Sequence, residues 1–253
     1  MTMLVLFGAI AVLAATCERL FPEREQRVLR AGLLTDGVYA ALNILLRIVF
    51  NASLGLAAIQ LASTVVPSRF IGVLSGHSIA VQAIAVILAF DFIFYWTHRA
   101  KHRWAWWWRL HETHHSSVEL DWFSSVRFHP FEKILDRTIY LVPIVFFGVS
   151  ETALLILAGV DALQGTFAHA NIRLKLGPLK YLLVGPQMHR WHHSSNPEDQ
   201  NSNFGNNLSI FDWIFGTARV PAAAPLAFGT VDPAFPAGNI ASQFLYVFRS
   251  RSG

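Results

Sequence analysis

Long apolar runs separated by short polar segments dominate this chain. The runs cover residues 1–17, 33–66, 78–97 and 139–168. A helix needs about 20 mainly apolar residues to cross the hydrocarbon core of a membrane. The pattern therefore predicts a short first membrane helix, one long span with an extension, a third span, and a fourth run that is too long for one crossing.

The fourth run contains Pro143, Gly148 and Glu151. We expect it to form a hairpin of two short helices with Glu151 near the outer turn. Arginines are concentrated in residues 18–30, and residues 101–109 read KHRWAWWWR. Basic loops favour the cytoplasmic side, and tryptophans favour the membrane interface. With a hairpin, the segments after the third and fourth runs then share the cytoplasmic face.

The rest of the chain is more polar and broken. Residues 194–207 are rich in Asn and Ser and are expected to form a loop, and the tail from residue 222 is expected to be irregular until residues 240–248. We divide the chain into N-terminal membrane helices with their loops (1–77), a central domain (78–220) and a C-terminal tail (221–253).

Composition supports a membrane protein. Hydrophobic residues make up 53% of the 253 residues and charged residues only 14%, whereas soluble domains have about 25% charged residues. The net charge of +4 comes from basic residues between apolar runs, which fits cytoplasmic loops better than nucleic-acid binding. Cys17 is the only cysteine, so the chain can form no internal disulfide and any metal ligands must be His, carboxylate or amide groups.

Eight of the 11 histidines lie in three clusters, one HxxxH and two HxxHH. Residues three and four apart share a face of a helix, so each cluster can direct two or three imidazoles to one point. Imidazole binds zinc, iron, copper and nickel. One HxxxH alone is weak evidence, but three recurrences favour a metal site, and eight ligands suit two metals better than one. The eight are His98, His102, His111, His114, His115, His189, His192 and His193.

Two other polar residues, Asp91 and His129, are candidates for support of this site. Asp91 precedes His98 by two helical turns. It can accept a hydrogen bond from a ligand imidazole or bond to another membrane helix, and the sequence leaves both open. His129, in an Arg-Phe-His-Pro stretch, is a candidate extra ligand or supporting group. Glu112 lies inside the second cluster but points away from the ligand face.

Several further stretches accompany the clusters and resemble one known family. They are DFIFYWTHR at 91–99, RFHP at 127–130, HAN at 169–171, NFGNN at 203–207 and FDWIFGT at 211–217. With the three clusters, they resemble the fatty acid hydroxylase and sterol desaturase superfamily of membrane di-iron oxygenases. The resemblance covers residues 85–220 and is specific for the superfamily, not for one member. It implies that the central domain (78–220) is a fatty acid hydroxylase-like catalytic domain.

The resemblance implies an all-α, integral-membrane helical bundle with a cytosolic helical cap that holds a histidine-rich di-metal site. It implies two iron ions, with zinc as a substitute in purified protein, and O2 as co-substrate. It also implies a separate electron donor, a ferredoxin or a cytochrome b5-like protein with its reductase. The eight clustered histidines would be ligands, with His169 as an additional ligand and His129 and Asn171 as additional or supporting residues. The protein would be multi-pass, in a bacterial inner membrane, with its clusters on the cytoplasmic side.

Three functions compete on this evidence. The first is O2-dependent hydroxylation or desaturation of an unactivated C–H bond of a lipid, such as a sterol or a fatty acyl chain. The second is zinc-dependent lipid hydrolysis, but a catalytic zinc usually takes three protein ligands, so eight are in excess. The third is non-enzymatic metal binding or transport, which would place ligands at mid-membrane depth instead of beyond the ends of the apolar runs.

Overall fold

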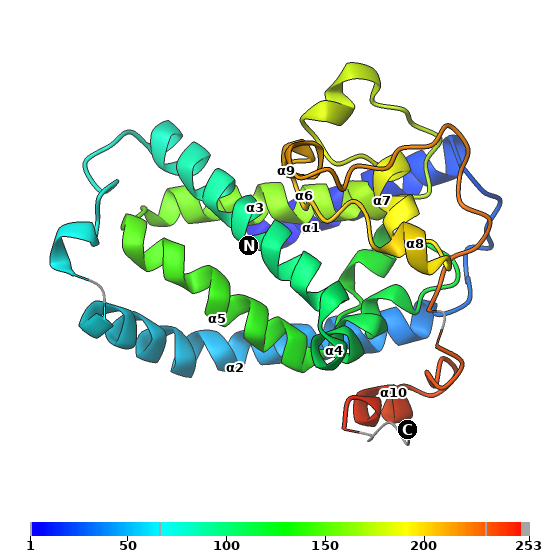
Figure 1. Cartoon of the computed structure of the whole chain (residues 1–253), viewed down its shortest axis with the longest axis horizontal. Helices are drawn as coiled ribbons and strands as arrows, with labels where there is room; N and C mark the ends of the chain where they lie inside the picture. The colour runs from blue at the N-terminus through cyan, green and yellow to red at the C-terminus, as the bar shows by residue number, and fades with distance from the viewer. Residues whose placement is uncertain (1, 66, 231, 249–253) are drawn as a thin grey trace.

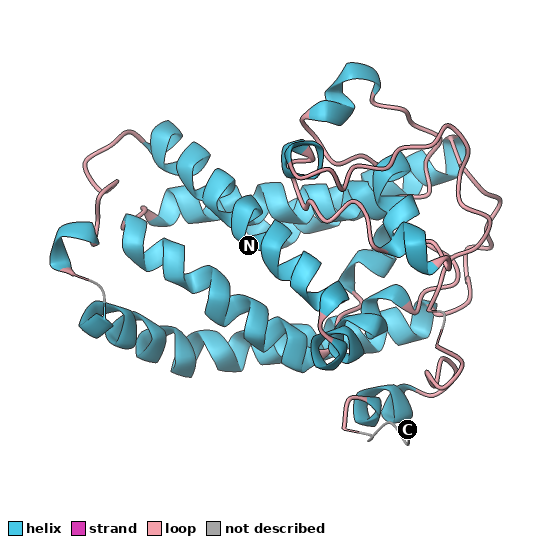
Figure 2. Cartoon of the chain, viewed as in Figure 1, coloured by secondary structure: helices cyan, strands magenta, loops and turns pink. Residues whose placement is uncertain are grey.

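The computed structural model describes residues 2–65, 67–230 and 232–248. Within these residues every extended element is a helix, and β-structure is confined to three isolated bridges (Figure 2). The all-α prediction is confirmed for this part of the chain.

Five long helices lie along the length of the molecule (Figure 1). They are α1 (Thr2–Leu20), α2 (Leu33–Val65), α3 (Ile79–Arg103), α5 (Pro130–Phe147) and α6 (Glu151–His169). Shorter elements connect or cover them: η1 (Ser68–Phe70), α4 (Ala105–His115), η2 (Trp122–Val126), η3 (Gly177–Tyr181), α7 (Pro186–His192), α8 (Pro197–Gln200), α9 (Ile210–Ile214) and α10 (Ile240–Tyr246).

Helix α3 carries the third apolar run into the first histidine cluster without a break. Its first turn is capped by Ser78, whose side chain accepts a hydrogen bond from the backbone N–H of Val81, as a serine N-cap usually does. Within the described residues, α3 is the one helix with the length and apolar composition to cross a membrane. The predicted spans at 1–17 and 33–66 form helices α1 and α2 over their described residues, and residues 1 and 66 lie outside the described part of the chain.

The fourth apolar run forms the expected hairpin. Helix α5 ends at Phe147 and α6 begins at Glu151, so Glu151 lies at the turn. Gly148 has a φ of 56°, and a Cβ atom there would lie 2.5 Å from the Cα atom of Gly72. The turn therefore needs glycine for both its backbone conformation and its close contact.

Helix α5 begins at Pro130, nine residues before the start of the apolar run. Proline is favourable in the first turn of a helix. The charged residues Glu132 and Asp136 in this first half are buried, because both pair with Lys101 of α3. These internal ion pairs allow a charged segment to be a packed helix.

Helices α4, α7 and α8 gather with η2 at the end of the bundle where α2 begins and α6 ends (Figure 1). The tail also returns to this region, because Gln243 of α10 accepts a hydrogen bond from the buried Tyr39 hydroxyl at 3.3 Å. Segments from distant parts of the sequence thus meet at this end of the bundle.

Candidate metal centre

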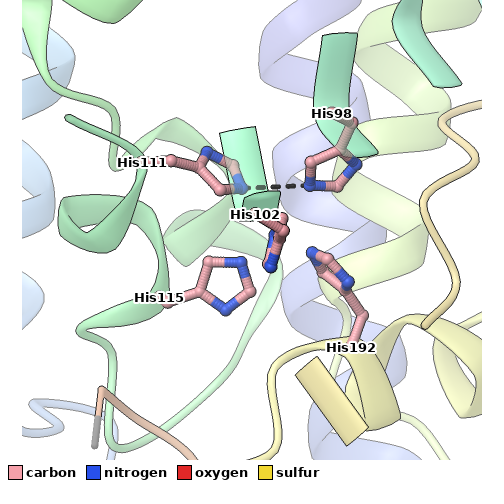
Figure 3. Close-up of side chains that lie close together, drawn as sticks. All are labelled: His98, His102, His111, His115 and His192. Atoms are coloured by element: carbon pink, nitrogen blue, oxygen red, sulfur yellow. Dashed lines mark hydrogen bonds between the residues drawn. The ribbon is translucent and has the colours of Figure 1, made fainter. Parts of the chain in front are cut away.

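The structure brings nine histidines together in two adjacent groups. The five-histidine group consists of His98, His102, His111, His115 and His192. The four-histidine group consists of His114, His169, His189 and His193. Within each group, one ring nitrogen per residue lies within 4.8 Å of the others. Figure 3 shows the imidazoles of the five-histidine group turned toward one another.

Each HxxHH cluster is divided between the two groups. On α4, His111 and His115 are four residues apart and face the five-histidine group, while His114 faces the four-histidine group. The segment around α7 divides in the same way, with His192 separated from His189 and His193. A step of one residue turns a helix by about 100°, so adjacent histidines serve different groups.

Backbone carbonyls orient two imidazoles of the five-histidine group. His98 Nδ1 donates to the carbonyl of Phe204 at 2.9 Å, and His192 Nδ1 donates to the carbonyl of Ser202 at 2.7 Å. A carbonyl oxygen can only accept, so Nδ1 of each ring must carry the proton. In a neutral imidazole, Nε2 is then left with a lone pair directed into the group.

His111 is oriented in the same way by a carboxylate. Its Nδ1 donates to Glu132 Oε1 at 2.8 Å, and its Nε2 lies 3.0 Å from His98 Nε2 (Figure 3). Two bare lone pairs cannot bond to each other, so this approach requires a shared proton or a cation. Burial lowers the pKa of His111, which disfavours the extra proton. A metal cation fits the donor set.

The four-histidine group repeats this geometry. His114 Nδ1 donates to the carbonyl of Arg127 at 3.0 Å, and His169 Nδ1 donates to that of Gly165 at 2.8 Å. Their Nε2 atoms then face each other at 3.3 Å. Burial and neighbouring imidazoles hold the pKa of His114 well below its usual value.

Other imidazole nitrogens in the groups are buried without a hydrogen-bond partner. They include Nε2 of His102, Nε2 of His192 and both ring nitrogens of His115. Burial lowers the pKa of His192 to about 3, so this ring is neutral at physiological pH. Buried polar atoms usually have partners, and a metal ion would supply one. Imidazole-rich sites suit iron, zinc, copper and nickel, so the residues present fit the predicted metals.

The other predicted site residues lie elsewhere. His129 belongs to neither group: its Nδ1 accepts from the backbone N–H of Phe131, and its Nε2 lies 3.3 Å from the carbonyl of Phe244. Asn171 exchanges hydrogen bonds with Arg24 and donates from its backbone to Glu18. These bonds fasten the N-terminal loop.

Asp91 also has different partners from those we expected. Its carboxylate accepts from the backbone and side chain of Asn207 and from the backbone of Leu208. These are loop residues, neither ligand imidazoles nor another membrane helix. Phe204 belongs to the same loop, and its carbonyl orients His98 of α3. By binding this loop, Asp91 attaches it to α3, the helix that carries His98.

Sequence reasoning missed two residues that shape this loop. The Asp212 carboxylate accepts from the backbone N–H groups of Phe204 and Gly205, at 2.7 and 2.8 Å. A Cβ atom on Gly205 would lie 2.5 Å from the carbonyl oxygen of Leu208. Both residues lie in stretches that were recognised as motifs. The motifs did not indicate that these residues position the Phe204 carbonyl.

Glu132 was missed as well. It comes two residues after the RFHP stretch, and a lone glutamate at the edge of a polar segment resembles a solvated charge. Its contact with His111 depends on α5 packing against α3 and α4, and no local sequence signal reports that packing.

A model of the family described as "Fatty acid hydroxylase" matches residues 83–217, more than half of the chain and all nine histidines of the two groups. The chain belongs to this family.

Several curated members are similar to this chain. Ornithine lipid hydroxylase OlsE of Rhizobium tropici is 32% identical over 142 residues, which cover 56% of this chain and 43% of that protein. Alkylglycerol monooxygenase of Homo sapiens is 29% identical over 164 residues, 65% of this chain and 36% of that protein. Very-long-chain aldehyde decarbonylase GL1-5 of Oryza sativa is 29% identical over 140 residues, 50% and 22% of the two chains.

The matched region spans less than half the length of these three relatives. No solved structure matches this chain.

Proposed function

We propose that this protein is an integral-membrane oxygenase that uses two iron ions, O2 and external electrons to hydroxylate or desaturate an unactivated C–H bond of a lipid. The observation that carries the proposal is the pair of adjacent histidine groups with their lone pairs turned inward. The names of the relatives, a lipid hydroxylase and a monooxygenase among them, support the class of reaction.

The five-histidine group would hold one ion and the four-histidine group the other. Iron bound there would supply the activation of O2 and the oxidising power that no amino-acid side chain has. The protein's own contribution is orientation and exclusion of water. Backbone carbonyls and Glu132 fix the tautomers of the ligands, and His115, His192 and His193 are fully buried.

The substrate in this proposal is a membrane lipid. Helix α3 would cross the bilayer, and Trp104 and Trp106, both exposed, follow its histidine-bearing end. Tryptophan favours the interface between lipid tails and headgroups. A lipid could therefore present its polar end at this level while its hydrocarbon chain reaches the metals. The reducing electrons would come from a separate ferredoxin or cytochrome b5-like protein.

The test is oxygen transfer to lipid by purified, iron-loaded protein with a ferredoxin and its reductase. We expect a lipid product that carries an oxygen atom from isotopically labelled O2, or one with a new double bond. His114→Ala and His192→Ala should each abolish turnover, because each removes a ligand. His77→Ala, at an exposed histidine outside both groups, should retain it.

Full activity in both ligand variants would contradict the proposal. The two alternative functions predict different results. Lipid cleavage that continues without O2 would indicate a zinc-dependent hydrolase. Metal passage across the membrane without any lipid product would indicate a transporter.

A further inference from the structure

A buried ion cluster lies directly behind the five-histidine group. Lys101 Nζ of α3 lies 2.9 Å from Glu132 Oε1 and 2.7 Å from Asp136 Oδ1, both on α5. Glu132 Oε1 also accepts the hydrogen bond from His111 Nδ1 on α4 at 2.8 Å. The side chains of Lys101, Glu132 and Asp136 are each at most 3% exposed. Three helices are thus joined at one carboxylate.

The two histidine groups differ in whether a carboxylate orients one of their rings. In the four-histidine group, His114 and His169 donate to the backbone carbonyls of Arg127 and Gly165. Among the described residues, no carboxylate pairs with a histidine of that group. A carboxylate behind a ligand histidine fixes the ring and makes the facing nitrogen a stronger donor to metal. A neutral carbonyl fixes the ring but adds no charge.

We propose that Glu132 is a positioning residue: it holds the Nε2 lone pair of His111 toward the five-histidine group and makes that group the tighter of the two metal positions. This inference rests on the proposed metal centre, but not on the identity of the lipid or on the reaction.

Asp136 provides a matched control. Glu132→Gln and Asp136→Asn each remove one buried negative charge and leave Lys101 with one carboxylate partner. They differ in the contact with His111, which Glu132 makes. A role limited to neutralising Lys101 would give both variants the same defect, whereas a role through His111 would give the defect to Glu132→Gln.

Cobalt(II) is a suitable probe, because its visible absorption reports coordination and its binding needs neither O2 nor lipid. Metal-free protein in detergent is titrated, and bound metal per chain is measured. We expect the wild type to fill two positions in sequence. Glu132→Gln should weaken the first by about 10- to 100-fold, as loss of such a partner usually does, and Asp136→Asn should leave both unchanged.

Two further variants locate the effect. Glu132→Asp keeps the negative charge but withdraws the carboxylate by one methylene, so it should show the same weakening even if Glu132→Gln folds poorly. The double variant Glu132→Gln/His111→Ala should bind cobalt no more weakly than His111→Ala alone, because both changes act through one ring.

The outcomes separate this inference from the proposed function. Equal weakening in Glu132→Gln and Asp136→Asn, or no weakening in either Glu132 variant, would overturn the role of Glu132. Wild-type protein that takes up no cobalt would overturn both proposals. Normal cobalt binding with the expected Glu132 effect, but no lipid oxidation under any condition, would support this inference and remove the proposed function.

Discussion

At the scale of the residue, the hydrogen bond made by one ring nitrogen of a histidine decides whether the other nitrogen can bind a metal. Spacing identified eight histidines as candidate ligands and the family resemblance added His169, and the structure brings all nine into two groups. Spacing could not identify the groups that hold each ring. These are the carbonyls of Phe204, Ser202, Arg127 and Gly165, and the carboxylate of Glu132. A backbone carbonyl carries no sequence signature, so the orienting contacts emerge only from the fold.

A second buried ion network lies behind the four-histidine group. Asp36 pairs with both Arg30 and Arg127, and Arg30 also pairs with Asp121. The carbonyl of Arg127 is the one that orients His114. The network therefore connects the first turn of α2 with the loop that aims a candidate ligand.

We expect Asp36→Asn to destabilise the protein by about 3–5 kcal/mol, the usual cost of leaving a buried charge without its partner. Two arginines lose that partner in this case. The measurement is thermal unfolding in detergent, with Glu198→Gln at an exposed position as the control. An unchanged midpoint in Asp36→Asn would mean that water or Asp121 replaces the lost charge.

At the scale of the element, the apolar runs were good predictors of helices, whereas the polar segments were not. The course of α3 and the α5–α6 hairpin followed from length and hydrophobicity. The first half of α5 did not, because Glu132 and Asp136 are buried through their pairing with Lys101. A charge that is satisfied by a distant helix looks the same in sequence as a charge in solvent.

The loop that carries Phe204 depends on the absence of a side chain at Gly205. We expect Gly205→Ala to force the Cβ atom against the carbonyl of Leu208 and the carboxylate of Asp212, with a cost of about 1–3 kcal/mol. The loop would shift and misdirect the Phe204 carbonyl from His98, so cobalt binding should weaken at the five-histidine group.

Gly159→Ala is the control for this change. Gly159 lies within α6 and has open space around its Cα atom, and alanine favours helix. It should leave stability and cobalt binding unchanged or slightly improved. Equal effects of Gly205→Ala and Gly159→Ala on stability and cobalt binding would show that the close contact at Gly205 does not cause the change.

At the scale of the whole molecule, the two ends of the bundle have different chemistry. One end carries the connections at residues 67–78 and 148–150, and the other carries the nine histidines beneath their covering loops (Figure 1). If the bundle crosses a membrane, the turns lie on one side and the histidines on the other. The basic, tryptophan-rich segment after α3 favours the cytoplasm for the histidine end.

Single-cysteine labelling in bacterial cells tests this arrangement, because Cys17 is the only native thiol. In a Cys17→Ser background, Gly76→Cys marks the turn and Glu198→Cys marks the histidine end, both at exposed positions. A membrane-impermeant maleimide should label residue 76 in intact cells and residue 198 only after permeabilisation. Labelling of residue 198 alone would reverse the orientation. Labelling of both in intact cells would place the two ends on one side, and the bundle could not then span the membrane along its length.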